Sequence, residues 1–418
     1  MSKTKFPIVK FNIAIQFLRW IVLIFPVSIF IGLVVALFLW VLDLVTTFRW
    51  QYLWLLFLLP LAGILINWMY TKFGKTSSAG TNLVFEEIHK PGVGIPPQMT
   101  PLIFSTTILT HLFGGSAGRE GTAVQMGGSI AAQFAGWFKL SINDRQILLM
   151  CGMSAGFAAV FGTPFAGAVF ALEVIGGLKY KALLPCLTAG IIAHFTCLAC
   201  GILHTKYTIS YLVNSDSFFS NFLLLKVIVA GILFGLVARV FSHLTHFIKN
   251  KSSQLIPVKW VIPVLGALLI ITISYLLGSF DYLGLGVSNP NATGISILSA
   301  FKEGGADKFS WFLKLVLTAI TLGMGFKGGE VTPLFFIGAT LGNVLATITG
   351  APIDLLAGLG FIAVFAGASN TPLACTIMGV ELFGAENIVY YAVACFIAYC
   401  FSGHLGIYNS QKKYRFKF

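Results

Sequence analysis

The chain has 418 residues, of which 57% are hydrophobic and only 10% are charged, and its mean hydropathy is +0.89. A soluble domain carries roughly 25% charged residues, so this composition excludes a soluble enzyme and indicates a membrane protein. The net charge of +13 does not indicate a nucleic-acid partner, because basic residues gather at the chain ends and in one mid-chain connection.

Uncharged stretches long enough to cross a bilayer, which needs about 20 residues, recur along the whole chain. They are Trp20–Leu42, Trp50–Thr71, Gln146–Leu172, Ala182–Thr205, Trp260–Phe280, Val331–Ile353, Leu355–Val380 and Asn387–Gln411. This pattern predicts an all-α polytopic membrane protein without a soluble catalytic domain. There is neither an HExxH motif nor a P-loop. We therefore expect no metal, no cofactor and no enzymatic activity, and any transport must draw on ion gradients.

Basic residues at both ends of the chain set its expected orientation. They are Lys3, Lys5, Lys10 and Arg19 at the start, and Lys412, Lys413, Arg415 and Lys417 at the end. By the positive-inside rule we expect a multi-pass protein of the inner (plasma) membrane with both termini in the cytoplasm. The first apolar run continues into Val41 without a small-residue cleavage site, so it is not a cleavable signal.

The first candidate binding segment is SSAGTNLVFEEIH (77–89), in which Gly80, Thr81 and Asn82 lead into an apolar run. This pattern is typical of a helix start, whose free backbone N–H groups attract anions. An ordinary capped amphipathic helix is the alternative interpretation.

The second candidate is GSAGREGTAVQMGG (115–128), where Arg119 and Glu120 lie between glycines. Each glycine costs about 1 kcal/mol of helix stability relative to Ala. We therefore expect a loop at membrane depth that becomes a helix near Glu120 and lines a cavity. An ionised Glu120 fills the anion site at this helix start, and a protonated Glu120 leaves it. The alternative is a plain ion pair with Arg119, but ionisable residues inside membranes favour a functional role.

These patterns recur later in the chain. Gly118-Arg119-Glu120-Gly121-Thr122 and Gly328-Gly329-Glu330-Val331-Thr332 share G-x-E-x-T, and TPFAGAVFALE (163–173) is echoed by TPLACTIMGVE (371–381). The first and second patterns are 43 residues apart in one case (Glu120 to Thr163) and 41 in the other (Glu330 to Thr371). Two patterns at one spacing indicate two related halves, although small-residue helix packing is an alternative source of such motifs.

We therefore expect five segments along the chain. They are a cytoplasmic N-terminal segment 1–16, a first membrane half 17–205, a connector 206–220, a second membrane half 221–408 and a basic cytoplasmic tail 409–418. Matching halves with glycine-broken helices indicate a secondary transporter whose site lies where the halves meet. Pro333 marks a helix start in the second half, and Thr332 either offers a hydroxyl to the site or acts as the N-cap.

The motifs resemble those of the CLC anion channels and transporters. GREGTAVQMGG (118–128) resembles the family's G-R-E-G-P motif, GGEVTP (328–333) falls at its G-x-F-x-P, and AGFAAVFGTPFAGAVFALE (155–173) resembles its apolar helix pair. The resemblance covers about Phe17–Tyr408. It implies a CLC-type inverted repeat of many short tilted and broken helices, a homodimer in the lipid bilayer, and Glu120 as the gating glutamate.

Departures from the chloride-transporting pattern resemble the fluoride/proton antiporter branch of that family. Gly80-Thr81-Asn82-Leu83 replaces a motif with a central serine, Thr122 and Val331 replace a motif proline and phenylalanine, and Val174 replaces the internal proton glutamate. In that branch a glutamate and a threonine take part in proton and fluoride handling, and the matching residues are Glu330 and Thr332. Whether Glu330 or Glu173 serves the proton route stays open.

The resemblance implies export of fluoride in exchange for protons, with Glu120 as the proton-coupled gate and Glu330 with Thr332 as a second coupling pair. The expected anion pathway contains Gly80, Thr81, Asn82, Gly118, Arg119, Gly121, Gly329, Val331 and Tyr408. Hydroxyl, amide and backbone donors suit fluoride, which is small and strongly hydrated. Tyr408 resembles the family's central tyrosine, and an interfacial anchor is the alternative interpretation.

Two other functions stay open from the sequence. The first keeps the fold and changes the substrate, giving a chloride or nitrate/proton exchanger or a passive anion channel. The distant alternative is an intramembrane serine hydrolase, because GGSAG (114–118) and GMSAG (152–156) match G-x-S-x-G. That motif indicates a nucleophile only in a strand-turn-helix context, which this chain does not predict.

Overall fold

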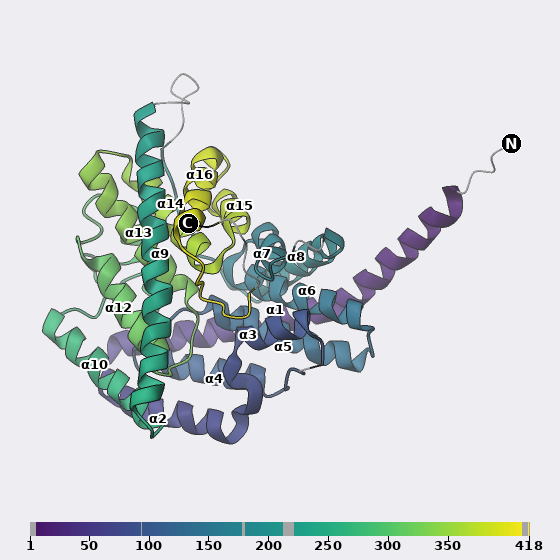
Figure 1. Ribbon diagram of the computed structural model, residues 1–418, viewed down its shortest axis with the longest axis horizontal. Coiled ribbons are helices and arrows are strands. Elements are labelled where there is room, and N and C mark those ends of the chain that lie inside the picture. The colour runs from purple at the N-terminus through teal and green to yellow at the C-terminus, as the bar shows by residue number, and fades with distance from the viewer. Residues whose placement is uncertain (1–5, 93, 178–179, 212–220, 412–416, 418) are drawn as a thin grey trace.

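The computed structural model describes residues 6–411 and 417, except 93, 178–179 and 212–220. Within this part the chain forms sixteen α-helices and a single isolated β-bridge, so the all-α prediction is confirmed. The first eight helices are α1 (Phe6–Gln51), α2 (Leu59–Met69), α3 (Thr81–His89), α4 (Met99–Leu112), α5 (Glu120–Trp137), α6 (Ile142–Phe161), α7 (Pro164–Glu173) and α8 (Leu183–Ala199). The second eight are α9 (Asn221–Leu255), α10 (Val261–Leu277), α11 (Ile297–Ala300), α12 (Ser310–Gly323), α13 (Val331–Thr349), α14 (Ile353–Ser369), α15 (Pro372–Phe383) and α16 (Ile388–Phe401). The colours of Figure 1 separate these two sets of helices.

Several helical segments have the length and apolar composition of membrane spans. Among the described residues they are Arg19–Gln51, Leu53–Gly74, Tyr180–Ala199, Phe222–Leu255 and Val331–Thr349. The span in α9 falls outside the uncharged stretches found in the sequence, because Lys226 and Arg239 interrupt its apolar run. Shorter apolar helices make up much of the remainder, as expected for a bundle of broken helices.

Two of the long uncharged stretches are helix pairs rather than single helices. Gly162, with φ 77°, follows α6 and Pro164 opens α7, while Asn370, with φ 59°, follows α14 and Pro372 opens α15. A residue in the left-handed conformation ends a helix. Proline fits the first turn, where its missing N–H group has no partner to lose.

The two halves repeat the same close packing. α5 packs on α6 in the first half and α13 packs on α14 in the second, and both pairs meet at glycines. A Cβ added at Gly127 would collide with the backbone carbonyl of Gly152, and one added at Gly338 would collide with that of Gly360. Small residues let helix backbones approach each other closely, which is a main source of helix packing in lipid. The repeat in the sequence is therefore also a repeat in packing.

A reciprocal pair of carboxylates links the halves. The Glu173 carboxylate, at the end of α7, accepts hydrogen bonds from two backbone N–H groups at the start of α15 (3.0 and 2.8 Å). The Glu381 carboxylate, in α15, accepts hydrogen bonds from two backbone N–H groups at the start of α7 (3.0 and 2.7 Å). Each half thus places a carboxylate at a helix start of the other, where the helix dipole favours negative charge.

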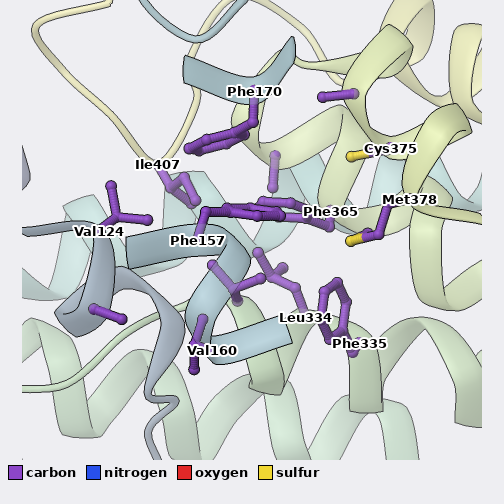
Figure 2. Close-up of a cluster of buried hydrophobic side chains, with 14 of the residues drawn as sticks. Val124, Phe157, Val160, Phe170, Leu334, Phe335, Phe365, Cys375, Met378 and Ile407 are labelled. Atoms are coloured by element: carbon purple, nitrogen blue, oxygen red, sulfur yellow. The ribbon is translucent and has the colours of Figure 1, made fainter. Parts of the chain in front are cut away.

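Aromatic side chains from both halves form part of the apolar core (Figure 2). Phe170 of α7 stacks on Phe157 of α6, with ring centroids 4.7 Å apart, and on Phe365 of α14, at 6.0 Å. Phe335, in the first turns of α13, stacks on Phe361 of α14 at 3.8 Å. All five rings are buried. This packing holds the start of α13 in a defined position relative to the first half.

The boundaries of the five predicted segments stay predictions. Residues 1–5, 212–220 and 412–416 lie outside the described residues, and they include parts of the N-terminal segment, the connector and the tail. α1 begins at Phe6, inside the segment expected to precede the membrane. The described start of the connector is joined to the second half, because the backbone N–H groups of Ser210 (2.5 Å) and Tyr211 (3.2 Å) donate to the Asp354 carboxylate.

Candidate functional site

The two matching motifs lie against each other. We call Gly118–Thr122 the first motif loop and Gly328–Thr332 the second motif loop. The N–H of Gly118 donates to the carbonyl of Gly329 (2.6 Å), and the N–H of Gly329 donates to the carbonyl of Gly118 (2.8 Å). The contact is antiparallel and is offset by one residue from the repeat, because Gly118 corresponds to Gly328 but pairs with Gly329. A Cβ at Gly118 would lie 2.9 Å from the carbonyl oxygen of Gly329, and one at Gly329 would lie 2.7 Å from the backbone nitrogen of Gly121, so both positions require glycine.

Glu120 is the first residue of α5, and its side chain is 3% exposed. Its Oε2 accepts hydrogen bonds from the backbone N–H of Arg119 (3.2 Å), from the backbone N–H of Thr332 (3.0 Å) and from the Thr332 hydroxyl. Its Oε1 lies 3.5 Å from Arg119 Nε. The carboxylate therefore occupies a point where the starts of α5 and α13 both offer donors that their own helices leave unpaired.

A small pocket of about 20 Å³ borders this carboxylate, which is room for about one water-sized particle. Its lining residues are Arg119, Glu120, Val160, Phe161, His204, Thr205, Tyr207, Val287, Thr332, Phe335, Phe361 and Leu382. Arg119 Nε makes no hydrogen bond within the described part of the chain, although it is in ion-pair range of Glu120. A guanidinium and a hydroxyl next to a displaceable carboxylate are suited to binding a small anion.

The equivalent threonines of the two motif loops have different partners. Thr332 donates its hydroxyl to Glu120, whereas the hydroxyl of Thr122 shares a hydrogen bond with that of Thr107 in α4 (3.0 Å). Glu330, and not Thr332, occupies the N-cap position of α13, so the N-cap interpretation of Thr332 is wrong. Val331 opens α13 and is 2% exposed.

The equivalent glutamates also differ in their surroundings. Glu330 Oε2 lies 3.4 Å from the position of a Cβ built on Gly121, so its side chain runs along the first motif loop. The charges that act on it are those of Lys249, near the end of α9, and Lys327. Glu330 is not among the residues that line the pocket beside Glu120. The two carboxylates thus have different neighbours at the contact between the motif loops.

The third expected helix start also approaches α5. Gly80 has φ 62°, and α3 begins at Thr81. A Cβ at Gly80 would lie 3.4 Å from Oε1 of Gln125 in α5. Asn82 Oδ1 accepts a hydrogen bond from the backbone N–H of Ser410 (3.1 Å), which ties this helix start to the C-terminal segment and leaves its NH₂ group as a donor.

Tyr408 belongs to the same C-terminal segment and is 5% exposed. Its ring packs edge-on against Phe85 (5.2 Å) and Phe170 (6.5 Å), and the charges of Glu330 and Glu120 act on its hydroxyl. That hydroxyl has no hydrogen-bonding partner among the described residues. Such burial does not fit an interfacial anchor, which lies at the headgroup level.

The remaining sequence candidates have structural partners. Val174 is fully buried, and the neighbouring Glu173 directs its carboxylate to the start of α15. Ser116 Oγ donates to the carbonyl of Tyr282 (2.9 Å), and Ser154 Oγ donates to that of Cys186 (2.8 Å). Neither serine bonds to a histidine within the described ranges, so the serine hydrolase hypothesis has no base beside either nucleophile.

Several pocket residues are absent from the site expected from the sequence. They are His204, Thr205 and Tyr207, which follow α8, together with Phe335 and Phe361. The available signal is the change from apolar to polar sequence after Leu203, shortly before the predicted connector 206–220. That signal marks the end of a membrane segment, but it does not show that the segment turns back over Glu120.

The sequence is similar to those of several known proteins. A family model described as "Voltage gated chloride channel" matches residues 62–403. The "Chloride/fluoride channel protein" of Pseudomonas syringae pv. tomato is 45% identical over 402 residues, which cover 94% of this chain and 86% of that protein. The "H(+)/Cl(-) exchange transporter ClcA" of Vibrio cholerae is 25% identical over 336 residues, covering 71% and 68% of the two chains.

Solved structures have the same architecture. The crystal structure of a CLC-type fluoride/proton antiporter matches with a TM-score of 0.88 at 36% identity, and the match covers 98% of this chain and 100% of that one. A slow cyanobacterial Cl⁻/H⁺ antiporter matches with a TM-score of 0.76 at 21% identity over 92% and 94% of the two chains, which shows the fold alone. Since the family model spans most of the sequence and the Pseudomonas relative is similar over nearly all of it, the chain belongs to the voltage-gated chloride channel (CLC) family.

Proposed function

We propose that the chain is a secondary active transporter that exports fluoride in exchange for protons entering the cell across the inner membrane. One observation carries this proposal: the Glu120 carboxylate is held by donors from both motif loops, beside a pocket the size of one small ion. The names of the Pseudomonas relative and of the fluoride/proton antiporter of known structure support fluoride as the substrate.

The exchange follows from competition for one set of donors. An ionised Glu120 takes hydrogen bonds from Arg119 and Thr332 that an incoming anion also needs. Hydrogen bonds to charged groups are worth about 1.5–3 kcal/mol each, and protonation of the carboxyl removes that advantage. The neutral side chain then yields its place to fluoride. Because proton and anion occupy the gate in turn, the downhill entry of protons drives the export of fluoride.

The donor types favour fluoride over larger halides. Fluoride is small and strongly hydrated, so its dehydration must be offset by short hydrogen bonds from hard donors. Hydroxyl, amide and backbone donors of this kind come from Thr81, Asn82, Thr332, Tyr408 and the glycines at 80, 118, 121 and 329. We place these residues along the pathway with Arg119 and Val331. Glu330, on the lysine side of the motif loops, is the second coupling residue.

We also infer a homodimer in a lipid bilayer with both termini in the cytoplasm. α7 packs on α8 and α15, and α15 packs on α16. This group of helices exposes the large apolar side chains Phe165, Leu184, Leu373, Ile388 and Phe396. Exposed apolar surface of this kind requires lipid or another protein surface to cover it. The basic residues at both ends support the cytoplasmic location of the termini.

The test of the proposed function is a flux assay on purified protein in liposomes, with fluoride and pH electrodes recording together. In the unmodified protein, fluoride movement in one direction should be accompanied by proton movement in the opposite direction. In Glu120→Gln the side chain keeps its size but cannot take up a proton as a carboxylate does. We expect fluoride to pass while the proton movement coupled to it falls to the background of empty liposomes. Proton coupling that is intact in Glu120→Gln would contradict the mechanism.

The second candidate function is a chloride or nitrate/proton exchanger, or a passive anion channel, of the same fold. The name of the Pseudomonas relative, which includes chloride as well as fluoride, favours keeping it. Equimolar replacement of fluoride by chloride or nitrate in the same liposomes separates the candidates. A chloride or nitrate flux equal to the fluoride flux would show that the substrate is not specifically fluoride. Fluoride flux without proton movement in the unmodified protein would show that the chain is a passive channel.

A further inference from the structure

Arg49, in the last turn of α1, is a buried cation without a full set of partners. Its side chain is 3% exposed, and its guanidinium carbon lies 4.7 Å from the centroid of the Trp50 ring. Across the described ranges of the chain, the guanidinium makes no hydrogen bond. An arginine has five N–H donors. Since the Arg49 nitrogens make no hydrogen bond with the described residues and are not among the fully buried atoms without a partner, they face open space, where water or an anion can accept from them.

Arg49 borders a cavity of about 300 Å³, which we call the Arg49 vestibule. Its lining includes Asp43, Trp50, Arg119, Thr205, Ser288 and Asn289. Glycines with positive φ lie against the guanidinium. A Cβ at Gly114 would lie 3.2 Å from Arg49 Nε, and a Cβ at Gly284 would lie 3.2 Å from its Nη1. The backbone of two loops thus approaches the cation closely without a side chain covering it.

Positive charge around the vestibule is poorly balanced. Lys314 is fully buried, and within the described part of the chain its ammonium donates only to two backbone carbonyls of the 282–284 loop (3.1 and 2.7 Å). Asp281 is the acid whose charge acts on Arg49, but its two oxygens already accept hydrogen bonds from the 289–295 loop (2.8 and 2.9 Å). Asp43 is exposed. A cavity with low-dielectric walls and an excess of one charge concentrates ions of the opposite charge.

The vestibule adjoins the pocket beside Glu120, since Arg119, Thr205 and Val287 line both. We propose that the vestibule is an anion-binding site, in which Arg49 binds a small inorganic anion that Arg119 exchanges with the gate at Glu120. The proposal rests on the proposed anion transport: in export the anion reaches the vestibule after the gate, and in the reverse direction, uptake, the vestibule is loaded first. Arg49 is then a residue that sets the apparent affinity for the transported anion, and the proton chemistry stays with Glu120.

The test varies external fluoride in an uptake assay with protein in liposomes. Arg49→Gln removes the charge, and we expect it to raise the half-saturating fluoride concentration at least fivefold, with the maximal rate and the proton-to-fluoride ratio unchanged. Arg49→Lys keeps a charge and should return the half-saturating concentration to within twofold of the unmodified protein. Arg19→Gln is the matched control, because it removes a charge from the same helix at an exposed ion pair with Asp144. It should leave the concentration dependence unaltered.

An Arg49→Gln protein whose half-saturating concentration stays within twofold, or which loses only its maximal rate, would overturn the anion-binding site. A second measurement needs no variant. Crystals of the unmodified protein soaked in bromide should give an anomalous peak in the vestibule beside Arg49, and its absence would also overturn the proposal. The bromide peak tests the site beside Arg49 even if the unmodified protein transports no fluoride. In that case the proposed function fails, and the binding site is judged separately. A bromide peak that persists in Arg49→Gln counts against the site.

Discussion

The first and second motif loops begin from the same pattern, and the molecule uses them differently. In the first, Glu120 crosses to the other half and takes the backbone N–H and hydroxyl of Thr332, while Thr122 turns away to Thr107. In the second, Glu330 runs along Gly121 under the influence of Lys249 and Lys327. The backbones are paired at Gly118 and Gly329, one residue out of the register of the repeat, and the side chains of the two loops have different partners.

This difference indicates how two related halves can present different chemical groups to a transported ion. If both glutamates bound the facing loop in the same way, the two sides of the contact would present equivalent gates. Here the Glu120 carboxylate takes the donors of both helix starts, whereas the Glu330 carboxylate lies beside Gly121 and is acted on by two lysines. In the proposed exchange, the proton and the anion therefore meet different side chains at the two motif loops.

The largest effect should come from the threonine that only the second motif loop contributes. Thr332→Val removes a hydroxyl that donates to the Glu120 carboxylate. Since such a bond is worth about 1.5–3 kcal/mol, and about 1.4 kcal/mol corresponds to a factor of ten, the gate should be displaced at least tenfold more often. Because fluoride loses the same donor, we expect the total fluoride flux to fall and the share of it that moves without protons (the leak), measured in liposomes at equal pH on both sides, to rise.

The equivalent threonine of the first motif loop supplies the control. Thr122→Val removes a bond to Thr107 and none to Glu120, so the leak should stay within twofold of the unmodified protein. Thr332→Ser keeps the hydroxyl and should keep the coupling. An equal leak in Thr122→Val and Thr332→Val would show that the asymmetry of the two loops has no role in gating.

A smaller effect is expected at the second glutamate. Glu330→Gln cannot hold a proton as a carboxyl, so proton movement should fall about fivefold while fluoride movement persists, as measured with paired electrodes. Glu303→Gln, in the exposed connection after α11, is a control that removes the same charge elsewhere. Normal coupling in Glu330→Gln would assign Glu330 to packing, and the two motif loops would then differ in only one functional side chain.

The smallest effect on transport is expected from the reciprocal carboxylates, whose contribution is to stability. Glu173→Ala and Glu381→Ala each leave two helix-start N–H groups without their acceptor, so each should lower the free energy of unfolding by about 1–3 kcal/mol. Thermal unfolding in detergent measures this loss, and flux per folded protein should be unchanged. Loss of proton transport in Glu173→Ala at unaltered stability would instead place Glu173 on the proton route.

Local sequence signals predict the helix starts and the membrane class well. Glycines before Glu120 and before Val331 make helix inside the loops unfavourable, and α5 and α13 begin at these residues. Proline after Thr163 and after Thr371 marks the starts of α7 and α15 in the same way. Such signals act over one or two turns of chain, so they can be read without knowledge of the tertiary structure.

Local sequence signals do not predict features that depend on partners far away in the sequence. Nothing near Arg49 in the sequence indicates that its guanidinium faces a cavity shared with Arg119. The polar residues after Leu203 suggest a connector, yet His204 and Tyr207 cover the pocket of Glu120. The sequence around Glu173 suggests a proton carrier and gives no sign that its carboxylate caps a helix. The N–H groups that it accepts hydrogen bonds from lie 200 and 201 residues further along the chain.

The exchanged carboxylates also constrain how the protein is made. At a synthesis rate of about 5–20 residues per second, the amides that Glu173 needs leave the ribosome roughly 10–40 seconds after Glu173 does. During that interval the Glu173 carboxylate lacks its donors, because the start of α15 has not been translated. The N–H groups at the start of α7 likewise lack their acceptor, Glu381. Water or the insertion machinery must hold both groups until the second half arrives. A chain truncated at the connector would keep these unmet partners and be a target for membrane proteases.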